Sequence, residues 1–112
     1  MQTLTLEVTD RNFEQVVLHS LRPVTLLFGA DWSGSTCIMQ TIIAEHADEL
    51  DEIVTCARID FARHAPVAAR FGVTSVPTII IFSAGHVTDM IVGMVSYSEL
   101  TDRIQTALKR ED

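Results

Sequence analysis

The sequence contains few basic residues and only two cysteines. Eight lysines and arginines stand against fifteen aspartates and glutamates, so the formal net charge is −7. Nucleic acids and anionic membrane surfaces bind basic protein faces, and we therefore expect neither as a partner. Cys37 and Cys56 are too few for a disulfide framework and fit a reducing compartment. We do not expect a bridge between them.

Long hydrophobic runs are also absent. No apolar segment approaches the ~20 residues of a membrane-spanning helix. The N-terminus alternates like a strand and lacks the basic start and apolar core of a signal peptide, so we expect a cytoplasmic protein with no membrane partner. Hydrophobic residues make up 47% of the chain and charged residues 21%. That composition is typical of a globular protein, and the length predicts a single domain over residues 1–112.

Five segments have the composition or the alternation of β-strands. They are residues 4–8, 24–28, 53–61, 79–82 and 87–92. The run 24–28 is almost continuously apolar, which is typical of a central strand covered on both faces. Cys56 lies inside an apolar strand and is predicted to be an inert core residue.

Four segments have apolar side chains at helical spacing. Their apolar positions are Phe13, Val16, Val17 and Leu21; Ile38, Met39, Ile42, Ile43, Ala47 and Leu50; residues 66–71; and Leu100, Ile104 and Leu108. Gly72 is expected to end the third helix in a left-handed conformation. Ser96 and Glu99 form a capping box at the start of the fourth.

These elements alternate along the chain as β-α-β-α-β-α-β-β-α. The alternation predicts an α/β protein with a central mixed sheet of about five strands. The first part of the sheet is expected to be parallel, with a hairpin added at the end. About four helices should cover its two faces.

The second helix carries two side chains of chemical interest. Cys37 lies outside the apolar stripe, so its sulfur is expected to be at least partly exposed. His46 lies at the edge of the stripe and is predicted to be a boundary residue. It is not expected to bind a metal ion, because no second His or Cys stands at ligand spacing and Glu49 alone would not complete a site.

The turn between the strand 24–28 and the second helix is the candidate functional loop. It reads Trp32-Ser33-Gly34-Ser35-Thr36 and is followed by Cys37. Such a turn places side chains and backbone N–H groups at the positive end of a helix, and Ser33 is positioned to cap that helix. The loop has no base, no acid pair and no phosphate-binding glycine pattern. A metal site, a nucleotide site, a cofactor or a hydrolase is therefore not expected.

Several motifs in register resemble the thioredoxin family over nearly the whole chain. They are Phe28-x-Ala30-x-Trp32-x-Gly34, the segment Phe-Gly-Val-Thr-Ser-Val-Pro-Thr at 71–78, the turn Phe-Ser-Ala-Gly at 82–85, and Val92-Gly93. The resemblance implies the thioredoxin fold. It also implies that Pro77 follows a cis peptide bond and faces the functional loop.

The sequence departs from this family where the family's chemistry occurs. The resemblance aligns Ser33 and Thr36 with the two redox cysteines, and Leu27 with a buried aspartate that accepts a proton beneath them. The aromatic residue common in the family at Gly29 is also absent. Dithiol exchange needs an attacking thiolate and a second thiol that resolves the mixed disulfide. Serine and threonine supply neither, and the loop contains no His to activate Ser33. Ordinary dithiol reductase activity is therefore not expected.

The first hypothesis is a redox-inactive module that binds a protein or extended peptide. The resemblance places a groove at Trp32, Phe61, Ser75, Val76, Pro77, Gly93 and Met94. The backbone before Pro77 could pair with an extended chain by strand addition, and Met94 and Phe61 would form an adaptable apolar rim. The alternative is that Trp32 and Phe61 cap the core.

Two further hypotheses remain open. A monothiol oxidoreductase would use Cys37, whose place in the first helical turn favours the thiolate, while nearby Asp31 disfavours it. The third hypothesis is an assembly or chaperone-like subunit, or a dimer that uses the same apolar patch. The sequence names no specific client.

Overall fold

The structure is a computed structural model that describes residues 6–50 and 53–109. One sheet has the strand order β1-β3-β2-β4-β5. Its strands are β1 (Leu6–Val8), β2 (Val24–Gly29), β3 (Thr55–Asp60), β4 (Thr78–Ser83) and β5 (His86–Val92). The first three pair in parallel, and β4 and β5 are antiparallel to their neighbours. The predicted mixed sheet is therefore confirmed, although residues 4 and 5 of the first predicted strand lie outside the described residues.

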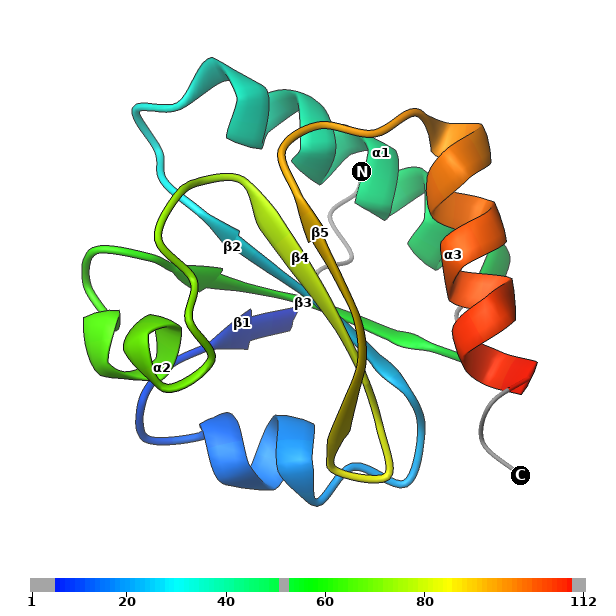
Figure 1. The fold of residues 1–112 in the computed structure, drawn as a ribbon, viewed down its shortest axis with the longest axis horizontal. Helices are drawn as coiled ribbons and strands as arrows, with labels where there is room; N and C mark the ends of the chain where they lie inside the picture. Colours follow the sequence, from blue (N-terminus) through cyan, green and yellow to red (C-terminus); the bar gives the residue numbers. More distant parts are fainter. Residues whose placement is uncertain (1–5, 51–52, 110–112) are drawn as a thin grey trace.

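Helices cover both faces of this sheet (Figure 1). The helical elements are η1 (Glu14–Leu18), α1 (Gly34–Leu50), α2 (Ala65–Arg70) and α3 (Tyr97–Lys109). The core on one face joins α1 and α3 to the sheet, and the core on the other joins η1 and α2 to it. All six residues of β2 are buried, because this central strand contributes side chains to both cores. None of the helices in the described part of the chain is long and apolar enough to cross a membrane.

The first helix differs from the prediction. It is a five-residue π-helix, closed by the His19 N–H donating to the Glu14 carbonyl oxygen at 2.9 Å. The Ser20 hydroxyl then forms hydrogen bonds with the Arg22 backbone in a tight turn. Leu21 lies in that turn and is fully exposed, so its predicted place on the buried face was wrong. The helix ends early because the wide π turn is followed at once by the segment leading into Pro23.

The apolar stripe of α1 is narrower than predicted. Met39, Ile43 and Ala47 are buried one turn apart along the helix and face the core shared with α3. Ile38, however, is 50% exposed, because it lies one residue to the side of that line. Its assignment to the buried stripe was wrong. The side chain of Leu50, the last predicted member, is outside the described residues.

Two of the predicted helix ends are confirmed. Gly72 has a φ of +73° just after α2, and the Val73 N–H that follows donates to the Ala68 carbonyl oxygen at 2.9 Å. At the start of α3, the Ser96 hydroxyl oxygen accepts a hydrogen bond from the Glu99 N–H at 3.0 Å. Glycine and serine at these positions satisfy backbone groups that the helix itself leaves unpaired.

His46 is a core residue and not the boundary residue that was predicted. It is 1% exposed, because α3 packs over the edge of the α1 stripe. Its ring stacks on Tyr97 with a centroid distance of 4.3 Å and an interplanar angle of 24°. Its Nε2 lies 2.9 Å from the Thr101 hydroxyl oxygen and 3.4 Å from the Tyr97 carbonyl oxygen.

These contacts determine which ring nitrogen of His46 carries the proton. The Thr101 hydroxyl donates to the Tyr97 carbonyl oxygen at 2.9 Å, so toward the imidazole it acts as an acceptor. A carbonyl oxygen can only accept, and Nε2 therefore donates to both oxygens. His46 Nδ1 is left as a buried acceptor without a hydrogen-bond partner among the described residues.

We predict that His46 stabilises the α1–α3 contact mainly through its stacked ring. Replacing His46 by Ala should lower the free energy of unfolding by about 2 kcal/mol, since it removes a buried ring and leaves a cavity. His46→Phe should cost less than half as much, because the ring stays and the Thr101 hydroxyl keeps its acceptor. Urea unfolding followed by circular dichroism measures both changes. His86→Ala, at an exposed histidine, is the control, and equal losses for the Ala and Phe variants at position 46 would contradict the prediction.

Candidate functional site

The loop that links β2 to α1 is held by hydrogen bonds at the start of the helix. The Ser33 hydroxyl oxygen accepts from the Thr36 N–H at 3.1 Å, and the Ser33 carbonyl oxygen accepts from the Cys37 N–H at 3.2 Å. Ser33 is buried and occupies the N-cap position, as predicted. Its oxygen therefore satisfies a helix-end donor that would otherwise be unpaired.

Thr36 has a second structural role in this loop. It is 1% exposed, and its hydroxyl oxygen accepts a hydrogen bond from the Ala30 N–H at 3.3 Å. Its methyl group packs against Gly29, where an added Cβ would lie 2.4 Å from it. A side chain at position 29 would therefore clash with Thr36, which fills that space. The hydroxyl oxygens of Ser33 and Thr36 are thus both engaged by the backbone.

Trp32 and Cys37 are the exposed residues of this region with chemical or binding potential. Trp32 is 77% exposed, so the alternative in which it caps the core is wrong. Cys37 is a free, exposed thiol in the first turn of α1, whereas Cys56 is buried and forms no disulfide. The exposure predicted for Cys37 and the burial predicted for Cys56 are confirmed. The Cys37 N–H already donates to Ser33, so it is not available to a ligand.

A second segment leads into the sheet at the same end as the loop. Phe28, at the end of β2, pairs with Thr78, at the start of β4, and the segment Ser75-Val76-Pro77 directly precedes Thr78. The Val76–Pro77 peptide bond is cis. The Thr78 hydroxyl donates to the Ser75 carbonyl oxygen at 2.9 Å, which fixes the segment onto the sheet. Ser75 is exposed, Val76 is half-buried and Pro77 is buried.

The turn after β5 is hydrogen-bonded to this segment. The Gly93 N–H donates to the Pro77 carbonyl oxygen at 2.9 Å, and Gly93 adopts a φ of +90°, a conformation that favours glycine. The flanking residues Val92 and Met94 are 66% and 51% exposed. Val92 was not assigned to the site from the sequence. Its alternation with the buried Ile91 along a strand could have indicated its exposure.

Phe61 contributes less to the surface than the groove hypothesis required. It is half-buried and packs against the core beneath β1, β3 and α2. Its backbone N–H donates to the Gly29 carbonyl oxygen at 2.9 Å, which continues the β2–β3 pairing by one residue. Phe61 therefore covers one edge of the core beside the loop, and only part of its ring faces outward.

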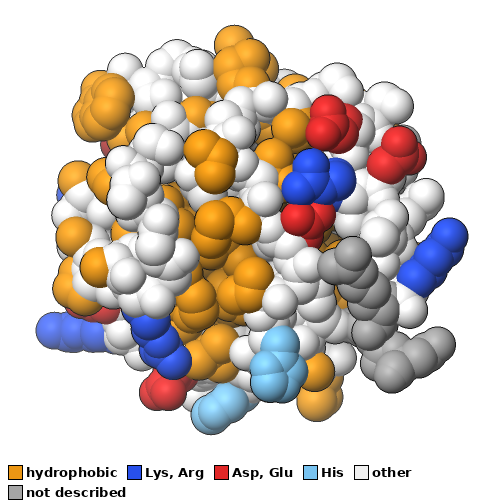
Figure 2. Space-filling model, viewed as in Figure 1, with side chains coloured by type: hydrophobic (Ala, Val, Ile, Leu, Met, Phe, Trp, Pro, Cys, Tyr) orange, Lys and Arg blue, Asp and Glu red, His pale blue; other side chains and the backbone are white. Residues whose placement is uncertain are grey.

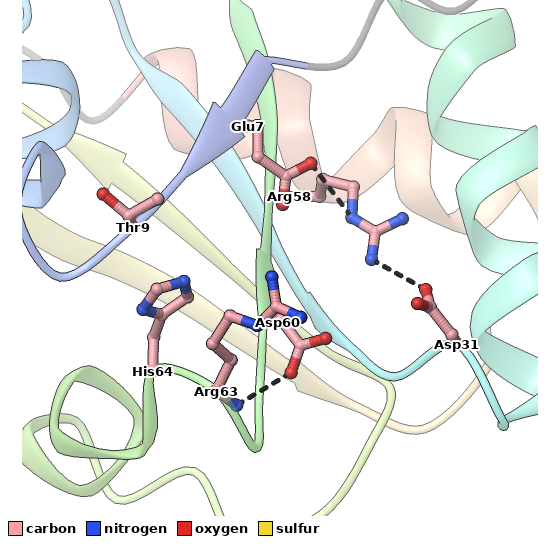
Figure 3. A pocket seen from close by; sticks show the side chains of 7 residues that line it. All are labelled: Glu7, Thr9, Asp31, Arg58, Asp60, Arg63 and His64. Carbon is pink, nitrogen blue, oxygen red and sulfur yellow. Dashed lines mark hydrogen bonds and ion pairs between the residues drawn. The ribbon is translucent and has the colours of Figure 1, made fainter.

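A polar recess of about 350 Å³ lies on the β1 side of the loop (Figure 3). Its lining residues are Glu7, Thr9, Asp31, Arg58, Asp60, Arg63 and His64. Arg58 crosses from β3 toward the loop and donates to Gln40 of α1 at 2.9 Å and to Asp31 at 3.4 Å. It also lies 3.7 Å from the Glu7 carboxylate. The Arg58 charge is thus shared among groups of this chain.

Arg58 is the residue of this region that sequence reasoning missed. The loop itself contains no Lys or Arg, but β2–β3 pairing brings Arg58 beside Leu27. The alternation of side chains along β3 could have predicted this position. It places Arg58 on the face covered by α1, whereas Ala57 and Ile59 enter the opposite core. Arg58 holds Asp31, the residue next to Trp32, against α1.

The arrangement offers one free thiol, one exposed indole and backbone groups at a sheet end. Within the described residues, no three His, Cys, Asp or Glu side chains gather closely enough to hold a metal ion. Ser33 has no histidine partner among its hydrogen bonds, and its oxygen is a helix cap. The site is therefore better suited to binding than to nucleophilic catalysis by a hydroxyl group.

Comparisons with known proteins agree with this geometry. The thioredoxin family model matches residues 4–106. A thioredoxin of Pyropia yezoensis is 32% identical over 98 residues, which cover 88% of this chain and 92% of that protein. Thioredoxin 1 of Nostoc sp. (strain PCC 7120) is 31% identical over 91% of this chain and 95% of its own.

A further relative is a longer protein. The bifunctional thioredoxin reductase/thioredoxin of Mycobacterium leprae is 37% identical over 90 residues, which cover 80% of this chain and 20% of that protein. The fold, the position of the loop and the match to the family model agree. The chain belongs to the thioredoxin family.

Proposed function

We propose that this chain is a thioredoxin-family protein that binds an extended segment of a client protein and does not carry out dithiol exchange. One observation carries the proposal. The hydroxyl oxygens of Ser33 and Thr36 are engaged as backbone caps, while the apolar side chains around them stay exposed. A loop that has lost its thiols but presents an indole to solvent is suited to recognition.

The proposed binding region is the apolar surface, which we define as Trp32, Val76, Val92 and Met94. Three of these side chains, Trp32, Val92 and Met94, are at least half exposed, and exposed apolar area often marks an interaction site. Figure 2 shows a strip of hydrophobic side chains running down the middle of the face on which β5 lies. Val76, next to the sheet end, would offer its backbone to an extended client by strand addition.

The names of the relatives favour a redox role for the family as a whole. The residues of this chain favour a different use of the same fold, because a mixed disulfide formed here would lack the neighbouring thiol that resolves it. The proposed location is the cytoplasm, which rests on two cysteines that form no disulfide.

We predict that client binding depends on the apolar surface. Trp32→Ala should weaken binding of a captured client about 30-fold, since a central aromatic anchor contributes about 2 kcal/mol. Val76→Asp should weaken it at least as much, because it places a charge where the client backbone would pair. Clients are captured from lysate with the wild-type chain, and the affinity of a purified client is then measured by titration calorimetry.

Leu21→Ala is the matched control for these variants. Leu21 is fully exposed, lies in the turn before β2 and is not part of the apolar surface. Its replacement should leave the affinity unchanged. If all three variants bind the client as tightly as the wild-type chain, the apolar surface is not the binding region and the proposal is wrong.

The exposed thiol of Cys37 supports a second candidate function, a monothiol oxidoreductase. Its thiolate would attack a substrate disulfide and form a mixed disulfide with one sulfur while the other leaves as a thiolate. A low-molecular-weight thiol would then attack the mixed disulfide and release Cys37. The observation in favour is the exposure of Cys37 on the outer side of α1.

A comparison of three proteins in a disulfide-reduction assay separates the two candidates. We predict that the wild-type chain and Cys37→Ser both stay at the background rate. The Ser33→Cys/Thr36→Cys double variant should exceed that rate at least tenfold, because it restores an attacking and a resolving thiol at the start of α1. Wild-type activity that Cys37→Ser abolishes would instead establish the monothiol function.

A further inference from the structure

Strand β5 forms one edge of the sheet. It pairs with β4 on one side only, so its other side is a row of backbone groups directed away from the sheet. Unprotected rows of this kind pair readily with strands of other molecules. The exposed apolar residues Val87 and Val92, 44% and 66% exposed, lie near the two ends of β5.

The register of the hairpin shows which backbone groups face outward. The Gly93 N–H donates across to Pro77, so the backbone of Gly93 faces β4. In an antiparallel pair, successive residues alternate between facing the partner strand and facing away. Counting back from Gly93, Ile91 faces β4, whereas Met90 presents its N–H and carbonyl oxygen to the open edge.

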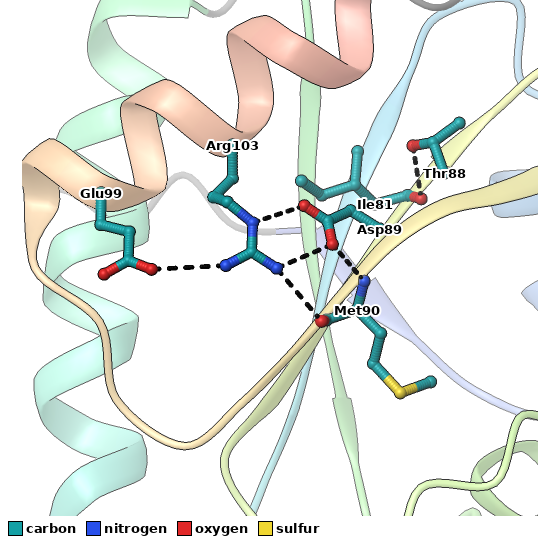
Figure 4. A network of polar contacts seen from close by, with 6 residues as sticks. All are labelled: Ile81, Thr88, Asp89, Met90, Glu99 and Arg103. Carbon is teal, nitrogen blue, oxygen red and sulfur yellow. Dashed lines mark hydrogen bonds and ion pairs between the residues drawn. The ribbon is translucent and has the colours of Figure 1, made fainter.

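Both outward groups of Met90 are already bonded within the chain (Figure 4). The Met90 N–H donates to Asp89 Oδ1 at 2.8 Å, and the Met90 carbonyl oxygen accepts from Arg103 Nη2 at 3.4 Å. At Met90, in the middle of the edge, the N–H and the carbonyl oxygen are therefore not available to another strand. Side chains of the same chain occupy the place that a neighbouring strand would take.

Arg103 is held in this position by two carboxylates. It donates from Nε to Asp89 Oδ2 at 2.6 Å and from Nη2 to Asp89 Oδ1 at 2.8 Å, a two-pronged pair that fixes the guanidinium plane. Its Nη1 donates to Glu99 at 3.3 Å, one turn earlier on α3. The hydrogen bonds to Asp89 raise the pKa of the Arg103 guanidinium, so the group stays charged.

We infer that the Asp89–Arg103 pair closes the β5 edge against strand addition by a second copy of this chain. Two copies of one edge strand can pair antiparallel about a two-fold axis, and each molecule then meets the same surface on its partner. Asp89 is the only Asp, Glu, Lys or Arg within β5. Without the pair, β5 would be a short, β-rich and nearly uncharged edge, which is the composition that favours self-association.

The test removes both charges at once. Asp89→Asn/Arg103→Gln leaves the net charge of the chain unchanged, so a change in self-association cannot come from a change in net charge. We expect its light-scattering mass to rise with concentration toward twice that of the monomer, while the wild-type mass stays constant over the same range. Glu99→Gln keeps the Asp89–Arg103 pair and is the control, with a constant mass expected.

Hydrogen exchange identifies the surface through which the variant associates. The Met90 N–H should exchange faster in the dilute double variant than in the wild-type chain, since its acceptor is weakened. In concentrated solution it should become protected as the second strand adds. A double variant that stays monomeric would overturn the inference, and so would one that associates without protecting Met90.

A milder variant covers the case in which the double variant does not fold, as judged by circular dichroism. Arg103→Lys keeps the charge but replaces a planar fork by a single ammonium group, which cannot bond Asp89 at two points and also reach the Met90 carbonyl oxygen. We expect weaker but measurable concentration-dependent association. A constant mass and unchanged Met90 exchange in this variant would overturn the inference.

Discussion

The burial of β2 on both faces is the constraint on which the rest of the structure depends. A strand buried along its whole length must have sheet partners on both sides and helices above and below. The end of β2 then determines where α1 can begin, and its pairing with β4 brings the segment before Thr78 to the same end of the sheet. The functional loop and the cis-proline segment are neighbours for this reason, whatever residues the loop contains.

The loop shows how the turn at the start of α1 is held by side-chain oxygens. A helix beginning at Gly34 needs acceptors for its first N–H groups. The Ser33 and Thr36 oxygens supply two of the acceptors in this turn, one for a helix N–H and one for the Ala30 N–H. The turn is therefore kept by interactions that need no thiol, and Thr36 leaves no room for a side chain at position 29.

Local patterns predicted most of the fold, and contacts between distant elements account for what they missed. The run 24–28 indicated a buried strand, and Ser33, Gly72 and Ser96 marked helix ends, because each of these features depends on neighbours within a few residues. Burial of His46 depends on α3 lying over α1, and the reach of Arg58 to Asp31 depends on strand pairing. No spacing within one segment encodes such contacts, whereas the position of the loop between a strand and a helix identified it without them.

The apolar surface and the β5 edge meet at Val92, and their requirements oppose each other. A surface that binds an extended client must leave apolar side chains and some backbone groups open, yet an open edge also admits a second copy of the same chain. Engaging Met90 through Asp89 and Arg103 resolves this conflict, because it closes the middle of β5 and leaves Val92 and the segment before Pro77 accessible. Two charged side chains, 14 residues apart in sequence, would thus separate the proposed client binding from self-association on a single sheet.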